Sequence, residues 1–294
     1  MRPESPRPAQ RPDPQPLGKP RRSPWRHWLA KPSARLVSAV LLVVLAIIFA
    51  TPADGGTTSL AARIANVVGL LPSSLHNSKS FAGTPAVGAL FTTSNGKLGS
   101  HFCTASVIHS PHGNLVITAA HCLSGTSGTI AFVPEYANGS TPYGIWYVSR
   151  VFQDEAWTSS SSPDDDVAFL EVTQHDAANV PIEDITGAEQ VGIGMPAQEL
   201  TRVVGYPNGT GEPVVCQNWT RAFSATQLQF DCGGYPDGTS GGPFLVGVDK
   251  ATGQGTVVGV IGGYEEGGDN PAVSYSAVFG PRVGSLYKQA EAAG

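Results

Sequence analysis

Charged side chains are scarce in this chain of 294 residues, and so is methionine. Asp, Glu, Lys and Arg make up 14% of the residues and methionine occurs only twice, whereas soluble domains usually carry about 25% charged residues. Helical bundles and coiled coils depend on Ala, Glu, Lys and Leu, so this composition argues against them. Glycine (35) and proline (24) are abundant instead, which favours many short strands joined by turns.

Basic residues become rare after the N-terminal end. Residues 1–35 contain nine Lys or Arg and two acids, a charge of +7, whereas residues 51–294 contain nine Lys or Arg and 21 acids, a charge of −12. The two parts together give the net charge of −5. The acidic part has no electrostatic footprint for nucleic acid, so we expect no nucleic-acid partner.

An apolar segment separates these two parts. Residues 1–35 hold nine prolines and nine basic residues and cannot bury enough apolar area to fold, so we predict a disordered tail. The segment that follows reads LVSAVLLVVLAIIFA and reaches 18 residues if it extends to Ala53. The basic flank predicts an N-terminus that stays in the cytoplasm and an exported C-terminal part.

Residues 36–53 are either a transmembrane anchor or a cleaved signal segment. A membrane-spanning helix needs about 20 residues, and Thr51-Pro52-Ala53 offers a small-residue cleavage site. A leading region of 35 residues is long for a signal peptide, so we favour the anchor, which would hold the protein on a membrane. Cleavage would release a secreted protein. Residues 54–80 are then a linker or a pro-segment.

The chain has only four cysteines, and all follow the apolar segment. An even number in an exported, oxidising setting predicts two disulfides. Four cysteines allow three pairings, and local strand logic favours Cys103–Cys122 and Cys216–Cys232. Residues 213–223 and 226–232 read as a hairpin that places Cys216 opposite Cys232. A zinc site is the alternative, but zinc sites usually bring two cysteines within about four residues of each other, and no such pair exists here. We expect no metal and no cofactor.

Short segments rich in Val, Ile, Phe and Thr recur through the rest of the chain and are bounded by Gly, Pro, Asn or Ser. Such segments predict strands, and only Pro281–Ala293 has a helical pattern. We therefore predict an all-β domain over residues 81–290 with a C-terminal helix. The predicted strands are Ala86–Thr92, Phe102–His109, Leu115–Thr118, Ile130–Pro134, Tyr143–Phe152, Val167–Val172, Leu200–Tyr206, Gln227–Cys232, Gly242–Val248, Thr256–Gly262 and Ser274–Phe279.

Three local patterns carry residue types that act together in acyl transfer. The sequence TAAHC contains His121, DDDVAFL contains Asp166 and GTSGGP contains Ser240. Taken alone, each has an ordinary explanation: a structural histidine, a solvated turn and a glycine-rich turn. Asp166 abuts an apolar strand, however, and a buried carboxylate needs a donor such as an imidazole N–H. A serine in turn needs a base to become a nucleophile.

No histidine follows Ser240, and this absence decides between hydrolase classes. The last histidine is His175, whereas α/β-hydrolases place their histidine after the serine. The subtilisin order requires an aspartate before the histidine, and the only two that precede His121 lie in the tail and the linker. The order that remains is histidine, Asp166, serine, which is the chymotrypsin order.

In this order the three motifs resemble the signature segments of the trypsin/chymotrypsin-like serine peptidases, over roughly residues 81–290. The stretch from Cys103 to Cys122 is also similar to the family's histidine loop. The resemblance implies two antiparallel six-stranded β-barrels with the active site between them. It implies roles as general base for His121, orienting residue for Asp166, nucleophile for Ser240, and oxyanion hole for Gly238 and Ser240.

Two positions depart from the family pattern. Thr239 stands where the animal members have an Asp that pairs with the new N-terminus after zymogen cleavage. Gly234 stands where trypsins have the Asp of the specificity pocket, which leaves Asp237 as the nearby group that could attract basic side chains. The small number of disulfides suits a bacterial member. By similarity with the family's substrate-binding edge, the residues expected to bind substrate are Gly262, Gly263 and Tyr264.

These observations predict a serine endopeptidase that hydrolyses peptide bonds of extracellular proteins through an acyl-enzyme intermediate. The expected partners are protein or peptide substrates, and a membrane if residues 36–53 are retained. The alternative is a catalytically weak relative that binds peptides in the same cleft. A third reading makes the N-terminal tail the active part and the β-domain a spacer. Neither alternative requires all three residues of the triad.

Overall fold

The computed structural model describes residues 76–126, 128–174 and 180–293, which belong to one unit over Leu70–Gly294. The expected tail, the apolar segment 36–53 and most of the expected linker lie outside these residues. Within the described ranges, no helix is long and apolar enough to cross a membrane.

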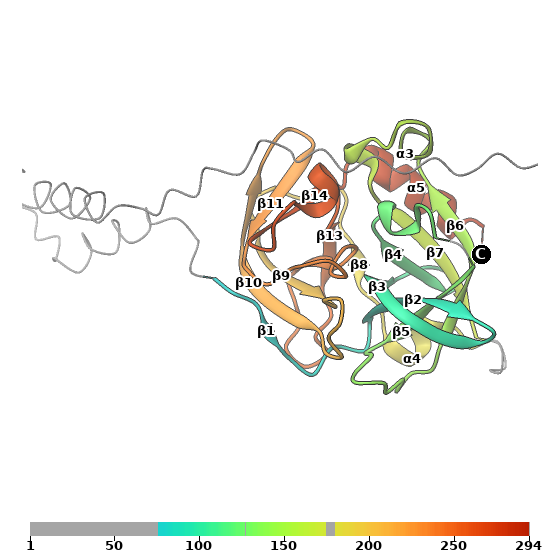
Figure 1. Ribbon diagram of the computed structural model, residues 1–294. Helices are drawn as coiled ribbons and strands as arrows, with labels where there is room; N and C mark the ends of the chain where they lie inside the picture. Colours follow the sequence, from blue (N-terminus) through green and yellow to red (C-terminus); the bar gives the residue numbers. More distant parts are fainter. Residues whose placement is uncertain (1–75, 127, 175–179, 294) are drawn as a thin grey trace, which may run out of the picture. The chain divides into compact units, whose positions relative to one another are not determined.

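The first half of the domain is a closed six-stranded barrel, as the family resemblance predicts (Figure 1). Its order is β2-β3-β4-β7-β6-β5. Asn95 and Gly96, both with positive φ, join the first two strands in a two-residue turn of the kind that hairpins favour. The core holds Leu90, Phe132 and Phe169, all fully buried. The strands are β2 (Val87–Ser94), β3 (Lys97–Ile108), β4 (Leu115–Thr118), β5 (Thr129–Pro134), β6 (Trp146–Gln153) and β7 (Ala168–Thr173).

The second half is an eight-stranded sheet with the order β14-β11-β10-β9-β12-β13-β8, and β1 pairs with β10. Its core contains Phe230, Phe244 and Val203. The strands are β1 (Lys79–Ser80), β8 (Gln190–Val191), β9 (Leu200–Gly205), β10 (Val214–Ala222), β11 (Gln227–Asp231), β12 (Pro243–Val246), β13 (Thr256–Val260) and β14 (Val273–Ala277).

This second sheet differs from the predicted six-stranded barrel because no ladder joins β13 to β14. The Ser276 hydroxyl lies between the two strands and accepts the Val260 N–H at 2.9 Å. The Ser276 side chain therefore accepts the N–H group that would otherwise donate to a backbone carbonyl in a strand ladder. Beyond the strand, the Gly262 N–H donates to the Tyr275 carbonyl at 3.0 Å, so the sheet closes by single contacts.

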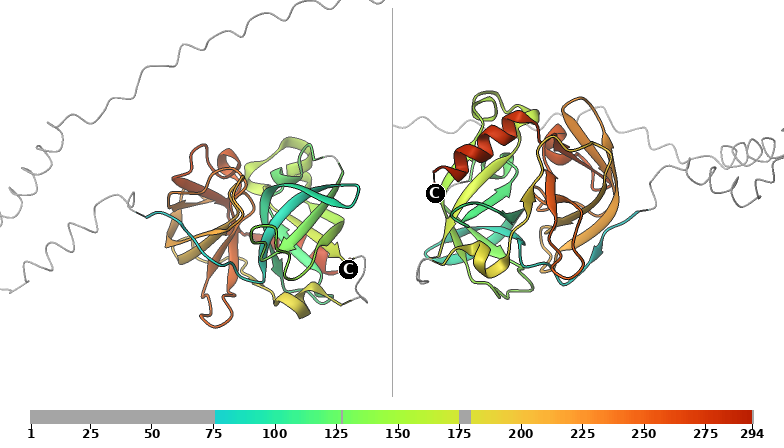
Figure 2. Two further views of the ribbon diagram at one scale, coloured as in Figure 1. Left: turned by 60° about the horizontal axis from the view of Figure 1, so that its bottom comes forward. Right: turned by 180° about the vertical axis from the view of Figure 1, so that it is seen from behind.

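Within the ranges that the structure describes, the helices are few and short except at the C-terminus. Helix α5 buries Val283, Leu286 and Ala290 and lies against the first barrel, as seen from behind in Figure 2. The sequence predicts α5 and misses the two shorter helices, which span too few residues to show a helical period. The helices are α3 (Glu155–Ser160), α4 (Ile182–Thr186) and α5 (Pro281–Glu291), with 3₁₀ turns η1 (His121–Leu123), η2 (Pro163–Asp165) and η3 (Tyr264–Gly267).

Both predicted disulfides are confirmed. One joins Cys103 on β3 to Cys122 in η1, and the other joins Cys216 on β10 to Cys232 just after β11. The hairpin expected from the sequence accounts for the second pair, because β10 and β11 are adjacent antiparallel strands.

Candidate active site

His121 begins the short turn η1, which follows strand β4 after two alanines. Its neighbour Cys122 is bonded to Cys103, with a Cα–Cα distance of 6.1 Å. The disulfide therefore ties the histidine-bearing turn to the wall of the first barrel.

Asp166 follows the turn η2 and points into the interior. Its side chain is 0% exposed and that of His121 is 11% exposed. Oδ1 accepts the backbone N–H of His121 at 2.8 Å, and Oδ2 lies 2.7 Å from His121 Nδ1 and accepts the Gly263 N–H at 2.8 Å. These donors supply what a buried carboxylate needs.

This pairing determines which ring nitrogen of His121 carries the proton. An ionised carboxylate only accepts hydrogen bonds, so the bond to Asp166 requires a proton on Nδ1. Nε2 is then the basic nitrogen, and it lies 3.9 Å from Cys122 Sγ. Among the described residues no hydrogen bond joins Nε2 to Ser240.

Ser240 lies in a glycine-rich turn that Thr104 of β3 holds in place. The Thr104 N–H donates to the Ser240 carbonyl at 2.7 Å, and its hydroxyl donates to the Gly238 carbonyl at 3.0 Å. Gly238 and Gly241 have φ angles of +93° and +79°, which favour glycine. Within the described part of the chain, the N–H groups of Gly238 and Ser240 donate to no protein atom, so both remain available to a ligand oxygen.

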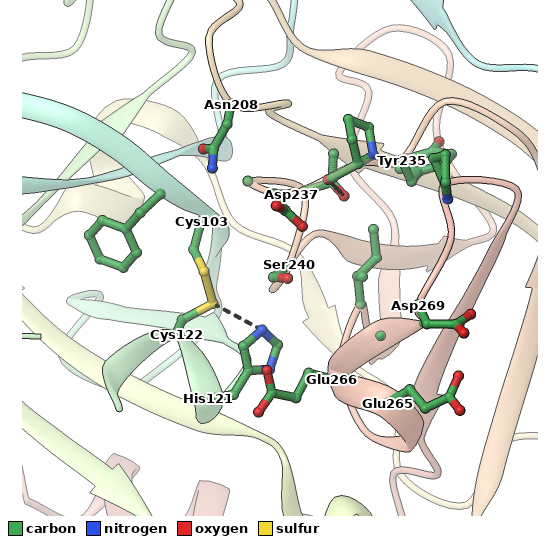
Figure 3. A pocket seen from close by; sticks show the side chains of 18 of the residues that line it. Cys103, His121, Cys122, Asn208, Tyr235, Asp237, Ser240, Glu265, Glu266 and Asp269 are labelled. Carbon is green, nitrogen blue, oxygen red and sulfur yellow. Dashed lines mark hydrogen bonds between the residues drawn. A yellow bond between two sulfur atoms is a disulfide. The ribbon is translucent and has the colours of Figure 1, made fainter. Parts of the chain in front are cut away.

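Ser240 and His121 line one cavity of about 1000 Å³ (Figure 3). None of the described residues that line it is Lys or Arg, so its carboxylates give it a negative potential. The acids that line it are Asp237, Glu265, Glu266 and Asp269.

The residues predicted to bind substrate lie beside this cavity rather than on its lining. The cavity wall includes Ile261 and Glu265, on either side of the predicted stretch from Gly262 to Tyr264. The backbone N–H groups of that stretch already bond to protein: Gly262 to Tyr275, Gly263 to Asp166, and Tyr264 to the Gln227 side chain. Gln227 carries no motif, and sequence reasoning does not identify it.

The cysteines beside His121 do not form a metal site in this state. Ligand atoms of Cys103, His121 and Cys122 lie within 4.8 Å of one another. Both sulfur atoms are bonded to each other in a disulfide, however, and metal binding requires the thiolate.

The two positions that depart from the family pattern are both packed against protein. Thr239 is 1% exposed, and its hydroxyl donates to the Pro236 carbonyl at 2.7 Å. The Gly234 carbonyl accepts the Ser78 hydroxyl at 3.2 Å. The Gly234 N–H donates to the Pro271 carbonyl at 2.8 Å. Asp237 lines the cavity and Gly234 does not.

Comparison with known proteins gives a family and a fold. The family model described as Trypsin matches residues 76–279. The protease Anisep from Arthrobacter nicotinovorans is 23% identical with a TM-score of 0.62, over 74% of this chain and 100% of that one. The thermostable serine protease AL20 from an extremophilic microorganism is 21% identical with a TM-score of 0.61, over 72% and 99%. At these identities the solved structures show a shared fold. No curated protein matches the chain.

Proposed function

The chain belongs to the trypsin-like serine peptidase family, and from this membership we propose that it is a serine endopeptidase with His121, Asp166 and Ser240 as its catalytic triad. The observation that carries the proposal is the buried Asp166 bonded to His121 Nδ1 at 2.7 Å, with the ring facing the cavity that Ser240 lines. This arrangement leaves a basic nitrogen beside a serine, which nucleophilic catalysis requires.

The proposed reaction begins when Ser240 Oγ attacks the carbonyl carbon of the scissile bond and His121 Nε2 takes the hydroxyl proton. Asp166 keeps the proton on Nδ1 and stabilises the imidazolium. The oxygen of the tetrahedral intermediate accepts the N–H groups of Gly238 and Ser240. The imidazolium then gives its proton to the leaving amine, and an acyl ester remains on Ser240. His121 then takes a proton from water, whose oxygen attacks the acyl carbon, and returns that proton to Ser240 Oγ as the ester bond breaks.

The proposal also places the enzyme outside the cytoplasm. Two disulfides persist in an oxidising compartment, and both cross-link the catalytic domain. The protein would be membrane-anchored through residues 36–53 with its N-terminus inside, or secreted after cleavage there. Its substrates would be extracellular proteins or peptides.

A fluorophosphonate probe tests the triad. Wild-type protein should be labelled at Ser240, and Ser240→Ala should abolish labelling and lower kcat by about 10⁶-fold, because the triad acts as a unit. Ser124→Ala is the matched control, since Ser124 lines the same cavity and its loss should leave labelling intact. Peptide binding without any labelling of the wild type would favour the peptide-binding alternative.

A further inference from the structure

Gln227, the first residue of β11, joins two segments that are remote from it in the sequence. Its side chain is buried, with the residue 4% exposed. Nε2 donates to Asp164 Oδ1 at 2.7 Å and to the Pro163 carbonyl at 3.1 Å, and Oε1 accepts the Tyr264 N–H at 3.0 Å. Both ends of one carboxamide are therefore bonded to different segments.

Those two segments also meet at the proposed catalytic aspartate. Asp164 lies in η2, the turn that leads into Asp166, and Gly263 precedes Tyr264 and donates to Asp166 Oδ2 at 2.8 Å. The contacts form a closed circuit from Asp166 through Gly263 and Tyr264 to Gln227 and back through η2. Gly263 has a φ of +79°, and an added Cβ would lie 2.3 Å from Gln227 Oε1 and 2.9 Å from the Ala277 backbone nitrogen, so this position of the circuit favours glycine.

We infer that Gln227 is a positioning residue that holds the backbone beside the substrate cavity in register with the catalytic aspartate. The inference rests on the proposed peptidase function. Tyr264 is followed directly by Glu265, which lines the cavity, so a shift of this backbone would move the cavity wall. The carboxamide of Gln227 offers a donor to Asp164 and an acceptor to Tyr264 at once.

A second support for η2 makes a matched control possible. Arg282 of α5 bonds Asp165 at 3.0 Å through Nε, on the same turn. Its other ion pair within the described residues is with Asp154 at 2.9 Å, away from Tyr264. Loss of this arginine would loosen the turn without releasing the backbone that leads to the cavity wall. A comparison of Arg282 and Gln227 variants therefore separates the effect of loosening η2 from the effect of releasing the backbone beside the cavity.

The experiment compares two substrates of the full-length protein, a tetrapeptide amide and the small ester p-nitrophenyl acetate. Gln227→Glu places a carboxylate against Asp164 and should lower kcat/KM on the tetrapeptide by about 10- to 100-fold, chiefly through KM, because a buried donor is lost. The ester reaches little of the cavity wall, so its hydrolysis should fall no further than in Arg282→Gln, which also loosens η2. Arg282→Gln should affect both substrates equally.

A double variant tests the hydrogen bond itself. Asp164→Asn combined with Gln227→Glu exchanges donor and acceptor across the Asp164 contact but leaves the Pro163 carbonyl without its donor. Rescue should therefore be partial, with kcat/KM on the tetrapeptide about threefold or more above that of Gln227→Glu alone. Gln227→Met serves if Gln227→Glu fails to fold, as judged by its thermal melt, and should show the same split between substrates.

The inference is overturned if Gln227 variants lose both activities equally, if they lose neither, or if the double variant shows no rescue. These results, in a wild type that the probe labels and that cleaves the tetrapeptide, leave the proposed function standing. A wild type that the probe does not label and that cleaves neither substrate overturns the proposed function, and the inference with it.

Discussion

At the scale of single residues, Gly238 is a position where backbone conformation and space both exclude a side chain. Its φ angle is +93°, and an added Cβ would lie 2.4 Å from Asn208 Oδ1 and 2.7 Å from the Tyr206 carbonyl oxygen. Nearby Gly209 also has a positive φ, +74°, but an added Cβ would meet nothing within 4 Å. A comparison of alanine variants at the two glycines therefore separates the effect of backbone strain from the effect of a steric clash at the added Cβ.

Gly238→Ala should lower kcat by about 10²–10³-fold, because the collision turns the peptide that carries a proposed oxyanion-hole donor. Gly209→Ala has a comparable backbone strain and should leave kcat unchanged while costing about 1 kcal/mol of stability. Steady-state kinetics and urea unfolding measure both effects. Equal kinetic losses in the two variants would show that Gly238 acts through general stability and not through the oxyanion hole.

A site residue can be predicted from the sequence when the residues next to it in the chain already indicate its role. His121, Asp166 and Ser240 stand in motifs whose local composition already suggests their chemistry, and their order along the chain separates one hydrolase class from the others. Gln227 lies 63 residues from Asp164 and 37 from Tyr264, and nothing next to it indicates either contact. Such a residue becomes visible only when the fold brings its partners together.

At the scale of elements, the sequence predicts strands well where both faces are buried and poorly where an element is short. Strand β4 runs over Leu115–Thr118 as predicted, and all four of its residues are buried. Strand β8 has only two residues, too few for any periodic pattern. Its partner β13 is parallel to it and begins at Thr256, so the two strands lie far apart in the chain and are joined only in the fold.

Next to β8 lies an acid that the proposed mechanism does not use. Glu189 is 0% exposed, with Oε2 accepting the Gly255 N–H and Oε1 without a partner among the described residues. Burial raises the pKa of this carboxyl from 4.5 to about 8, against the opposing effects of the Gly255 N–H and of Arg202. The folded protein therefore keeps a proton that the unfolded chain releases.

This difference predicts that stability falls as pH rises. Between pH 4.5 and about 8 the folded state binds one proton more than the unfolded state, so Glu189 lowers the free energy of unfolding by roughly 3–5 kcal/mol across that range. The stability that the extra proton on Glu189 gives the folded state is fully present below pH 4.5 and is lost above about 8. Glu189→Gln cannot titrate, and urea unfolding across this range should show a flatter profile for it. Parallel profiles for variant and wild type would contradict the prediction.

At the scale of the whole molecule, the start of the described chain packs against the second sheet close to the cavity. Lys79 and Ser80 of β1 pair with β10, and the Gly233 N–H donates to the His76 carbonyl at 2.9 Å. The following residue, Gly234, bonds Pro271, which lines the cavity. The segment from His76 to Ser80 thus braces a wall of the site from outside.

The position of this segment, together with Thr239, argues against activation by a newly formed N-terminus. Such activation requires a buried ammonium with a charged partner, because an unpaired buried charge is costly. Thr239 is uncharged and buried, and its hydroxyl already bonds Pro236. We therefore expect forms of the chain that begin at Gly56, Leu70 or Leu75, each with an added Met, to have similar kcat/KM on one peptide substrate.

A form that begins at Phe81 tests the brace directly, since it lacks β1 and the contacts with Gly233 and Gly234. Its KM should rise by about tenfold or more, because each lost hydrogen bond contributes about 1 kcal/mol to holding the wall, while labelling of Ser240 by the probe persists. Activity confined to one native start residue, and abolished by a single added Met, would mean that N-terminal insertion operates. Since Thr239 offers no charge, another acid near the turn, of which Asp237 is the nearest in sequence, would then have to pair with the ammonium.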